Sequence, residues 1–260
     1  MKCVTFTGGL GAQLVSTAAY LFLERAGESV VADMSYFEIP KKIEQLAALG
    51  IVYAAKESIF SWQLNNYGLI PSSFLQNETN YACDIIHDGG EKSEYALKGF
   101  RMPQVRERLK ITKLHETSIM QMIGNPKSYC CAHLRRGDFM DVASVVVGDE
   151  LFIAAVKSVA QLTQTLILVT DTELSSSLEE EILKFNTDVR IVVGGDPFIV
   201  HALMRLSSIL ITSNSQFSLT AAYLREPNQL TLVPLDSETS PAIIWGREVQ
   251  IVAGYKVFTH

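Results

Sequence analysis

The sequence of 260 residues lacks any uninterrupted apolar stretch of the roughly 20 residues that a membrane-spanning helix needs. Its first residues make a poor signal peptide, because three glycines interrupt the apolar run and two charged residues, Glu24 and Arg25, end it. We therefore expect a soluble protein of the cytoplasm with no transmembrane segment. A peripheral contact with a membrane surface stays open.

Cysteine is scarce, and the spacings typical of metal sites are missing. The four cysteines show no Cys-x-x-Cys pattern, and the adjacent Cys130 and Cys131 cannot easily bridge to each other. The five histidines show no ligand spacing, and no Gly-x-Ser-x-Gly turn for a nucleophilic serine is present. These absences favour a reducing compartment, no bound metal and no covalent enzyme intermediate.

The sequence also lacks an excess of basic residues. It has 22 Lys and Arg against 28 Asp and Glu, a formal net charge of -6, and a pI of about 5.4. A nucleic-acid-binding protein normally displays a basic surface, so we exclude nucleic acid as a partner. Local basic motifs must then belong to specific pockets.

What is abundant is apolar sequence: 48% of the residues are hydrophobic and the mean hydropathy is +0.17, which predicts well-formed cores. The N-terminal part predicts a βαβ unit, with a strand at 2–7, a glycine-rich turn at 8–11, a helix at 12–26 and a strand at 30–33. The next part is less regular, with a helix expected at 41–49, strands at 83–86 and 96–100, and helices after Pro103.

From Tyr129 onward, strands and helices alternate cleanly. We expect strands at 129–134, 165–171, 189–193, 209–212 and 230–233, separated by helices at 149–162, 174–185, 197–206 and 217–224. Such alternation predicts a parallel sheet with helices on both faces. Residues 125–128 make a plausible linker, so we expect two α/β domains, 1–125 and 126–260, that face each other across a cleft.

The glycine-rich turn brings backbone N–H groups and the positive end of a helix to one point, which suits phosphate or sugar oxygens. It does not match the dinucleotide pattern Gly-x-Gly-x-x-Gly, because Leu14 stands where the third glycine is needed after Gly9 and Gly11. Asp33 does imitate the ribose-binding acid of that fold, so a nicotinamide oxidoreductase is one alternative. The other is that the glycines only make a tight turn.

A second motif runs from His133 to Asp138 and follows a short apolar strand. Ligands bind at the carboxyl ends of strands in open α/β sheets, and arginine suits phosphate oxygens. Because side chains alternate along an extended segment, His133 and Arg135 should face a ligand together, whereas Arg136 should support the loop by pairing with an acid such as Asp138 or by packing between layers. A solvated basic loop is the alternative.

A third motif spans 212–217 and precedes an apolar helix. One hydroxyl or amide side chain is expected there as a helix cap, but the unbroken run of such residues from Thr212 to Gln216 exceeds that need and suggests a second phosphate cradle. Asp171 ends a predicted strand and suits either a hydrogen bond to a base or ribose or the N-cap of the next helix.

Together the three motifs resemble the bacterial α1,2-fucosyltransferases of glycosyltransferase family 11. That family has a Gly-Gly-Leu-Gly-Asn-Gln-Leu segment, a His-x-Arg-Arg-Gly-Asp motif and a Ser-Asn-Ser-x-Phe-Ser segment, which match the positions starting at Gly8, His133 and Ser213. The match departs from the family at two places: Ala12 replaces an asparagine, and Leu219-Thr220 replaces an aromatic pair.

The resemblance implies a GT-B-like fold and an inverting transfer of fucose from GDP-fucose to a glycan hydroxyl, with no metal. His133 and Arg135 would contact the nucleotide and its diphosphate, with Ser215 and Gln216 near the phosphates. Arg135 would stabilise the leaving diphosphate, and either Asp138 or Asp141 would serve as the general base. The substrate-binding set is completed by Gly9, Gly11, Gln13, Arg136, Asp171, Ser213, Asn214 and Phe217. A different nucleotide sugar, or a binding module without turnover, remains open, as do the acceptor, the linkage and the oligomeric state.

Overall fold

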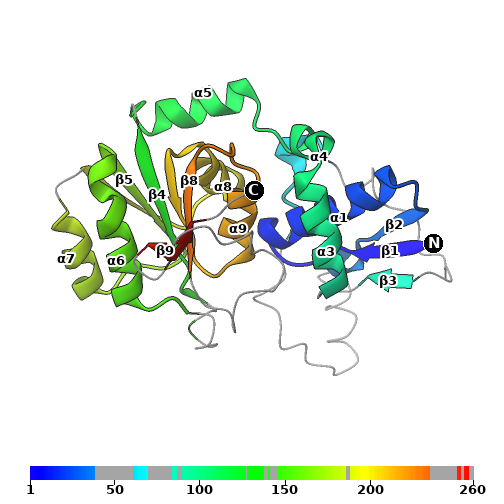
Figure 1. Ribbon diagram of the computed structural model, residues 1–260, viewed down its shortest axis with the longest axis horizontal. Coiled ribbons are helices and arrows are strands. Elements are labelled where there is room, and N and C mark those ends of the chain that lie inside the picture. Colours follow the sequence, from blue (N-terminus) through cyan, green and yellow to red (C-terminus); the bar gives the residue numbers. More distant parts are fainter. Residues whose placement is uncertain are drawn as a thin grey trace. The chain divides into compact units, whose positions relative to one another are not determined.

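The computed structural model describes residues 1–38, 61–69, 84–86, 90–126, 128–137, 140, 146–185, 188–234, 251–252 and 255–257. The chain divides into two compact units, Met1–Leu109 and Lys110–His260 (Figure 1). The expected division after residue 125 therefore falls inside the second unit. The reason is helix α5 (Lys113–Met122), whose His115 ring lies 5.0 Å from the ring of Phe198 in that unit.

The first unit contains the expected βαβ unit. Strand β1 (Lys2–Thr5) pairs in parallel with β2 (Val30–Asp33) and with β3 (Asp84–Ile86), and α1 (Leu10–Arg25) connects the first two. Strand β3 confirms the short strand expected at 83–86. The unit also contains α3 (Gly90–Arg101), α4 (Pro103–Arg108) and the 3₁₀ turns η1 (Ser35–Glu38) and η2 (Asn65–Tyr67).

The strand expected at 96–100 is wrong, because these residues lie inside α3. Gly99 faces α1 at very close range: a Cβ at this position would lie 2.2 Å from the carbonyl oxygen of Ala18. The glycine therefore lets two helix backbones approach rather than ending an element. The helix expected at 41–49 lies outside the described residues.

The second unit is built on a seven-stranded sheet with the order β6-β5-β4-β7-β8-β10-β9. The first five are parallel, as expected, and β10 and β9 are antiparallel. The strands span β4 (Tyr129–Leu134), β5 (Thr165–Thr170), β6 (Asp188–Val193), β7 (Ile209–Ile211), β8 (Leu230–Pro234), β9 (Ile251–Val252) and β10 (Tyr255–Val257). The helices are α5, α6 (Asp149–Val159), α7 (Ser176–Leu183), α8 (Pro197–Leu206), α9 (Gln216–Tyr223) and the short η6 (Ala160–Leu162).

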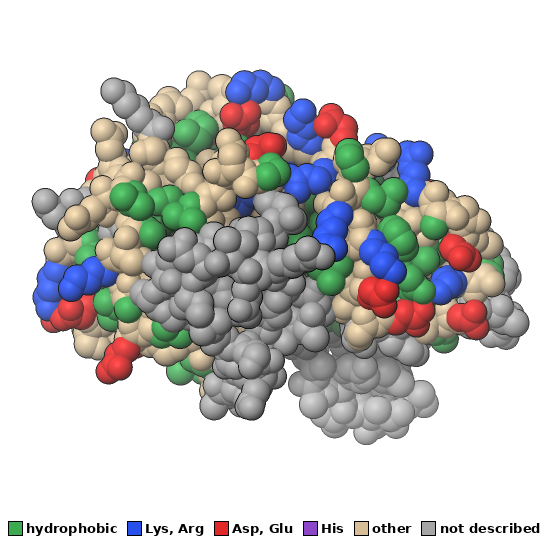
Figure 2. All heavy atoms as spheres, viewed as in Figure 1, with side chains coloured by type: hydrophobic (Ala, Val, Ile, Leu, Met, Phe, Trp, Pro, Cys, Tyr) green, Lys and Arg blue, Asp and Glu red, His purple; other side chains and the backbone are tan. Residues whose placement is uncertain are grey.

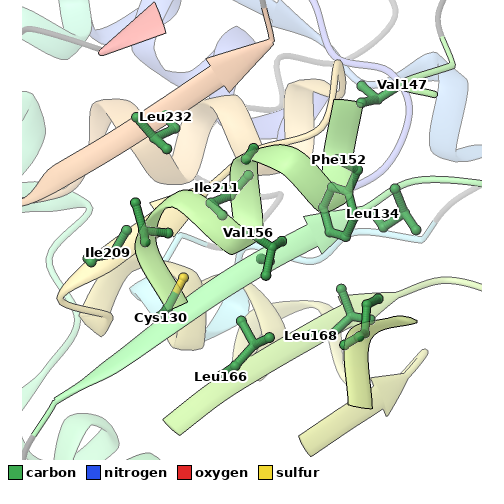
Figure 3. Packing of buried hydrophobic residues seen from close by; sticks show 14 of the residues in the cluster. Cys130, Leu134, Val147, Phe152, Val156, Leu166, Leu168, Ile209, Ile211 and Leu232 are labelled. Carbon is green, nitrogen blue, oxygen red and sulfur yellow. The ribbon is translucent and has the colours of Figure 1, made fainter. Parts of the chain in front are cut away.

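Alternate side chains of β4 face different helices. Cys130, Ala132 and Leu134 pack in a buried cluster with residues of α6 and α7, among them Phe152 (Figure 3). Tyr129 points the other way and donates its hydroxyl to the Leu203 carbonyl of α8 at 2.8 Å. Helices therefore cover both faces of this sheet.

Among the described residues, no helix is both long and apolar enough to cross a membrane. Lys and Arg side chains lie interspersed with Asp and Glu side chains on the face of the molecule in Figure 2.

The cysteines Cys3, Cys130 and Cys131 are buried as free thiols, and burial raises the pKa of the Cys130 thiol to about 12. The thiol of Cys130 is therefore protonated at neutral pH.

Candidate nucleotide-sugar site

The second and third motifs meet where the chain reverses its direction of travel across the larger sheet. From β4 the chain proceeds through β5 to β6, and then returns to the other side of β4 with β7 and β8. Strands β4 and β7 are therefore neighbours whose following loops diverge, which is the position where open α/β sheets bind ligands. His133 lies at the end of β4, and Ser213 follows β7.

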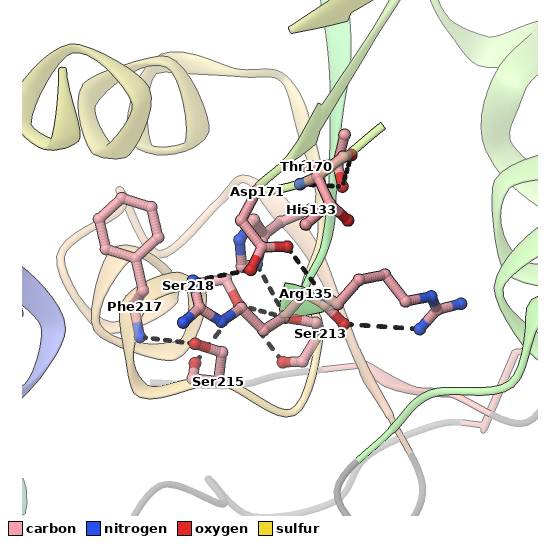
Figure 4. Close-up of polar contacts among 10 residues, drawn as sticks. His133, Arg135, Thr170, Asp171, Ser213, Ser215, Phe217 and Ser218 are labelled. Atoms are coloured by element: carbon pink, nitrogen blue, oxygen red, sulfur yellow. Dashed lines mark hydrogen bonds and ion pairs between the residues drawn. The ribbon is translucent and has the colours of Figure 1, made fainter. Parts of the chain in front are cut away.

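His133 joins the two motifs directly. Its Nδ1 atom lies 2.8 Å from the Ser213 hydroxyl, and its ring centroid lies 5.6 Å from that of Phe217 (Figure 4). Ser213 also contacts Ser218, whose hydroxyl donates to the Ser213 carbonyl oxygen at 3.3 Å. His133 is only 3% exposed, and its Nε2 atom is the ring nitrogen that these contacts leave for a ligand.

A second buried histidine supports the first through an aromatic ring. The His201 ring centroid lies 5.4 Å from that of Phe217, and its Nε2 lies 3.2 Å from the Thr220 hydroxyl. That hydroxyl donates to the Gln216 carbonyl at 2.8 Å, so its oxygen accepts from His201 and places the imidazole proton on Nε2. Thr220, one of the departures from the family, thus has a structural partner in His201.

Both histidines are neutral at pH 7. Burial lowers the pKa of His133 to about 3, with the nearby Arg135 charge adding to the effect. Burial also lowers the pKa of His201 well below its usual value, assisted by the charge of Arg205. The positive charge of the second motif therefore comes from its arginines and not from His133.

Arg135 and Arg136 diverge, as side-chain alternation predicts. The Arg135 guanidinium forms an ion pair with Asp171 at 3.0 Å and is 26% exposed. The Arg136 guanidinium lies on the other side of the segment, where it donates to the Val147 carbonyl at 2.8 Å and pairs with Asp149 at the start of α6. Arg136 therefore supports the loop through Asp149.

Asp171 lies directly after β5 and contacts two residues of the second motif. Its Oδ1 accepts the backbone N–H of Arg136 at 2.7 Å, while Oδ2 faces Arg135. The alternative role as N-cap of the following helix is wrong, since the Ser175 hydroxyl caps α7 by accepting from Leu178 N–H. The two candidate bases, Asp138 and Asp141, lie outside the described residues.

The third motif forms a buried loop in front of α9. The Ser215 hydroxyl caps this helix by accepting the Phe217 N–H at 3.3 Å. Ser213 and Asn214 are buried, at 2% and 4% exposure, and Gln216 is half-buried as the first residue of the helix. The motif therefore serves as a cap and also aligns the helix start with the end of β4.

The glycine-rich turn belongs to the first unit. Gly9 is the N-cap of α1 and makes no side-chain capping bond, and Gly8 adopts a φ of +67° that favours glycine. Gln13 is fully buried, and its amide bonds the backbone at Gly8, Ser61 and Gln63, each at 2.9 Å. Its side chain therefore anchors the turn, and the N–H groups after Gly9, including Gly11, are the groups available to a ligand.

Two buried polar residues of the second unit, His201 near the site and Arg225 away from it, have no clear signal in the sequence. His201 lies inside an ordinary apolar helical pattern, and nothing in its spacing relates it to Phe217 or His133. Arg225 is 1% exposed and donates to the Met204 carbonyl at 2.5 Å and the Ser207 hydroxyl at 2.6 Å, which ties the segment after α9 to the end of α8. Both contacts join segments about 20 residues apart and arise only in the folded sheet.

Several solved structures resemble the chain. The fucosyltransferase NodZ from Bradyrhizobium is 16% identical, with a TM-score of 0.47 over 91% of this chain and 94% of that chain. POFUT1 in complex with GDP-fucose is 9% identical, with a TM-score of 0.48 over 89% and 96%. The ADP-heptose LPS heptosyltransferase II of E. coli is 11% identical, with a TM-score of 0.52 over 98% and 92%. The chain has the GT-B-like α/β fold that the motifs implied.

The sequence comparisons identify the family. A comparison with curated proteins finds no match. The model of the family described as glycosyl transferase family 11 matches residues 56–244, which include the second and third motifs and most of the larger sheet. The chain therefore belongs to glycosyl transferase family 11.

Proposed function

We propose that this glycosyltransferase moves fucose from GDP-fucose to a hydroxyl of a glycan acceptor, with inversion at the anomeric carbon and without a metal ion. The observation that carries the proposal is the convergence of Arg135, neutral His133 and the Ser213 loop at the carboxyl ends of β4 and β7. Membership of family 11 and the motif resemblance to α1,2-fucosyltransferases support fucose as the transferred sugar.

The arrangement suits the departure of a nucleoside diphosphate. When the bond between the anomeric carbon and the diphosphate oxygen breaks, the sugar gains oxocarbenium character and negative charge builds on the phosphate. The Arg135 guanidinium supplies fixed donors for that charge, and the N–H groups at the start of α9 point toward the same edge. His133 offers Nε2 to a donor oxygen without adding a second charge.

Inversion requires the acceptor oxygen to attack the opposite face of the sugar while a base removes its proton. Asp138 and Asp141 are our two candidates for that base, and we propose that one of them fills the role. We also propose that the reaction takes place in the cytoplasm, where the nucleotide-sugar donor would be present.

Binding experiments in EDTA test the donor assignment. Ligands that bind the native state raise the melting temperature by mass action, so GDP should stabilise the protein whereas UDP, ADP and NADH should not. Stabilisation by NADH alone would favour the oxidoreductase alternative, and stabilisation by UDP or ADP alone would favour another sugar donor.

Turnover is tested separately with GDP-fucose and a panel of glycans. Release of GDP that depends on the acceptor, and is unchanged by EDTA, is the expected result. GDP binding with no transfer to any acceptor would instead support a binding module, and NMR of the product decides between inversion and retention.

A further inference from the structure

We propose that Asp171 is a positioning residue: it aims the Arg135 guanidinium and fixes the turn at residues 135–137, and it does not contact the donor. This inference rests on the proposed function, since it concerns the group that stabilises the leaving diphosphate. It differs from the sequence-based prediction, in which the Asp171 carboxylate accepts hydrogen bonds from a base or ribose.

Both carboxylate oxygens of Asp171 already face donors of the second motif. Oδ1 accepts the backbone N–H of Arg136 at 2.7 Å, and Oδ2 lies 3.0 Å from Nη1 of Arg135. One carboxylate therefore holds a main-chain atom and a side chain of two successive residues. Figure 4 shows Asp171 between the end of β5 and Arg135.

Gly137 provides a third, independent observation. Its φ is +26°, and a Cβ on this residue would lie 2.3 Å from Oδ2 of Asp171. The turn thus passes so close to the carboxylate that only a residue without a side chain fits without movement. The Asp171 carboxylate therefore lies against three consecutive residues of the turn, Arg135, Arg136 and Gly137.

The loop that carries Asp171 is itself held in place. The Thr170 hydroxyl donates to the Thr172 carbonyl at 2.9 Å, bracing the turn at the end of β5. The Asp171 side chain is 21% exposed, so it stands at the rim of the site with its oxygens directed at protein donors. An arginine has five N–H donors, and the ion pair with Asp171 engages Nη1 of Arg135.

Removing the negative charge of Asp171 should affect ligand binding and turnover differently. In Asp171→Asn the amide keeps a similar shape but loses the negative charge. Only one of its two terminal atoms is an acceptor, so it cannot serve both the Arg136 N–H and Nη1 of Arg135, and the ion pair at this position is lost. The resting affinity for a diphosphate should therefore stay the same or increase. Turnover should fall on the order of 100-fold, because misplaced catalytic groups lose rate without losing ground-state binding.

The test measures binding of GDP and of inorganic pyrophosphate by calorimetry in EDTA, together with kcat for transfer from GDP-fucose. We expect unchanged or tighter binding of both ligands and the loss of kcat. Asp188→Asn is the matched control, since Asp188 pairs with Arg190 at the other end of the sheet and should leave binding and turnover unchanged.

Gly137→Ala perturbs the same contact from the opposite side and should reproduce the loss of kcat with GDP binding retained. Gly148→Ala, where an added Cβ meets nothing within 4 Å, is its control. The proposal fails if Asp171→Asn weakens binding of GDP but not of pyrophosphate, since that pattern assigns the carboxylate to the base or ribose. It also fails if kcat is unchanged. A wild-type protein that binds pyrophosphate but not GDP would instead reject the donor assignment.

Discussion

Arg135 and Arg136 carry the same charge but lie on opposite sides of one extended segment. Arg135 faces Asp171 at the open edge of the sheet, whereas Arg136, at 12% exposure, is tied to Val147 and Asp149 beside α6. Because an extended chain alternates its side chains, a neighbour in sequence is not a neighbour in the site. The two arginines should therefore respond differently to the same substitution.

Arg135→Ala should lower turnover on the order of 100-fold to 1000-fold, the usual loss when one well-aimed transition-state donor is removed. Arg135→Lys should recover only part of it, since lysine lacks the planar fork. Arg136→Ala should mainly lower the melting temperature. Steady-state kinetics and melting curves on the three variants separate the catalytic role of Arg135 from the structural role of Arg136. A dead but well-folded Arg136→Ala beside a nearly normal Arg135→Ala would move the catalytic role to Arg136.

The buried histidines make stability depend on pH. Both have pKa values below that of an unfolded histidine, near 6.5, so below that pH the unfolded state binds more protons than the native state. The free energy of unfolding should then fall by about 1 kcal/mol for each histidine as pH drops from 6.5 to 5.5, and the slope should approach about 1.4 kcal/mol per pH unit at lower pH. Well above pH 6.5 the two histidines should contribute no slope.

Urea unfolding at several pH values measures this slope, and His201→Gln should remove about half of the histidine part. The comparison between variant and wild type cancels the carboxylates, which titrate in both. Equal slopes for the two proteins between pH 5.5 and 6.5 would mean that His201 is protonated in the native state.

Helix α3 shows where local sequence misleads. Residues 96–100 are mostly apolar and include a glycine, a pattern that suggests a short strand, yet they continue the helix that begins at Gly90. Contact with α1 favours the helix over a strand here, because Gly99 allows the α3 backbone to lie against Ala18. In contrast, β4 and α8 have the bounds expected from their patterns, since an all-buried strand and a capped amphipathic helix each carry a strong local signal.

Gly99→Ala should destabilise the first unit by about 3 kcal/mol, near the upper end of the usual cost of overpacking, because the obstacle is a backbone carbonyl rather than a flexible side chain. Gly90→Ala is the control, since a Cβ at Gly90 has open space around it and the change should be small. Chemical denaturation of both variants gives the comparison. Equal stabilities would show that α1 and α3 separate at little cost.

The candidate site could be predicted from the sequence only in part. The end of β4, its two diverging arginines and the polar loop after β7 follow from periodicity and residue type. The strand order that makes β4 and β7 neighbours does not, because pairing depends on contacts between residues about 80 positions apart. The division after Leu109 likewise depends on α5 packing against α8, which no linker composition indicates.

The division into two units predicts how GDP stabilises the molecule. If the nucleotide contacts only the second unit, calorimetry should resolve two transitions, and GDP should move only the one that belongs to Lys110–His260. At 100 times its Kd, GDP adds about 2.7 kcal/mol to the stability of the unit that binds it. For a unit of this size, that corresponds to an increase in Tm of roughly 5 to 10 °C.

Gly99→Ala identifies the transitions, because it should lower only that of Met1–Leu109. A GDP-induced increase in both transitions would mean that the turn at Gly9 and Gly11 also binds the nucleotide. An increase confined to the first unit would contradict the assignment of the nucleotide to the edge of β4 and β7. The expected single shift, reduced in Arg135→Ala, would tie GDP to the unit that contains His133 and Asp171, since the lost guanidinium removes a direct contact to the diphosphate.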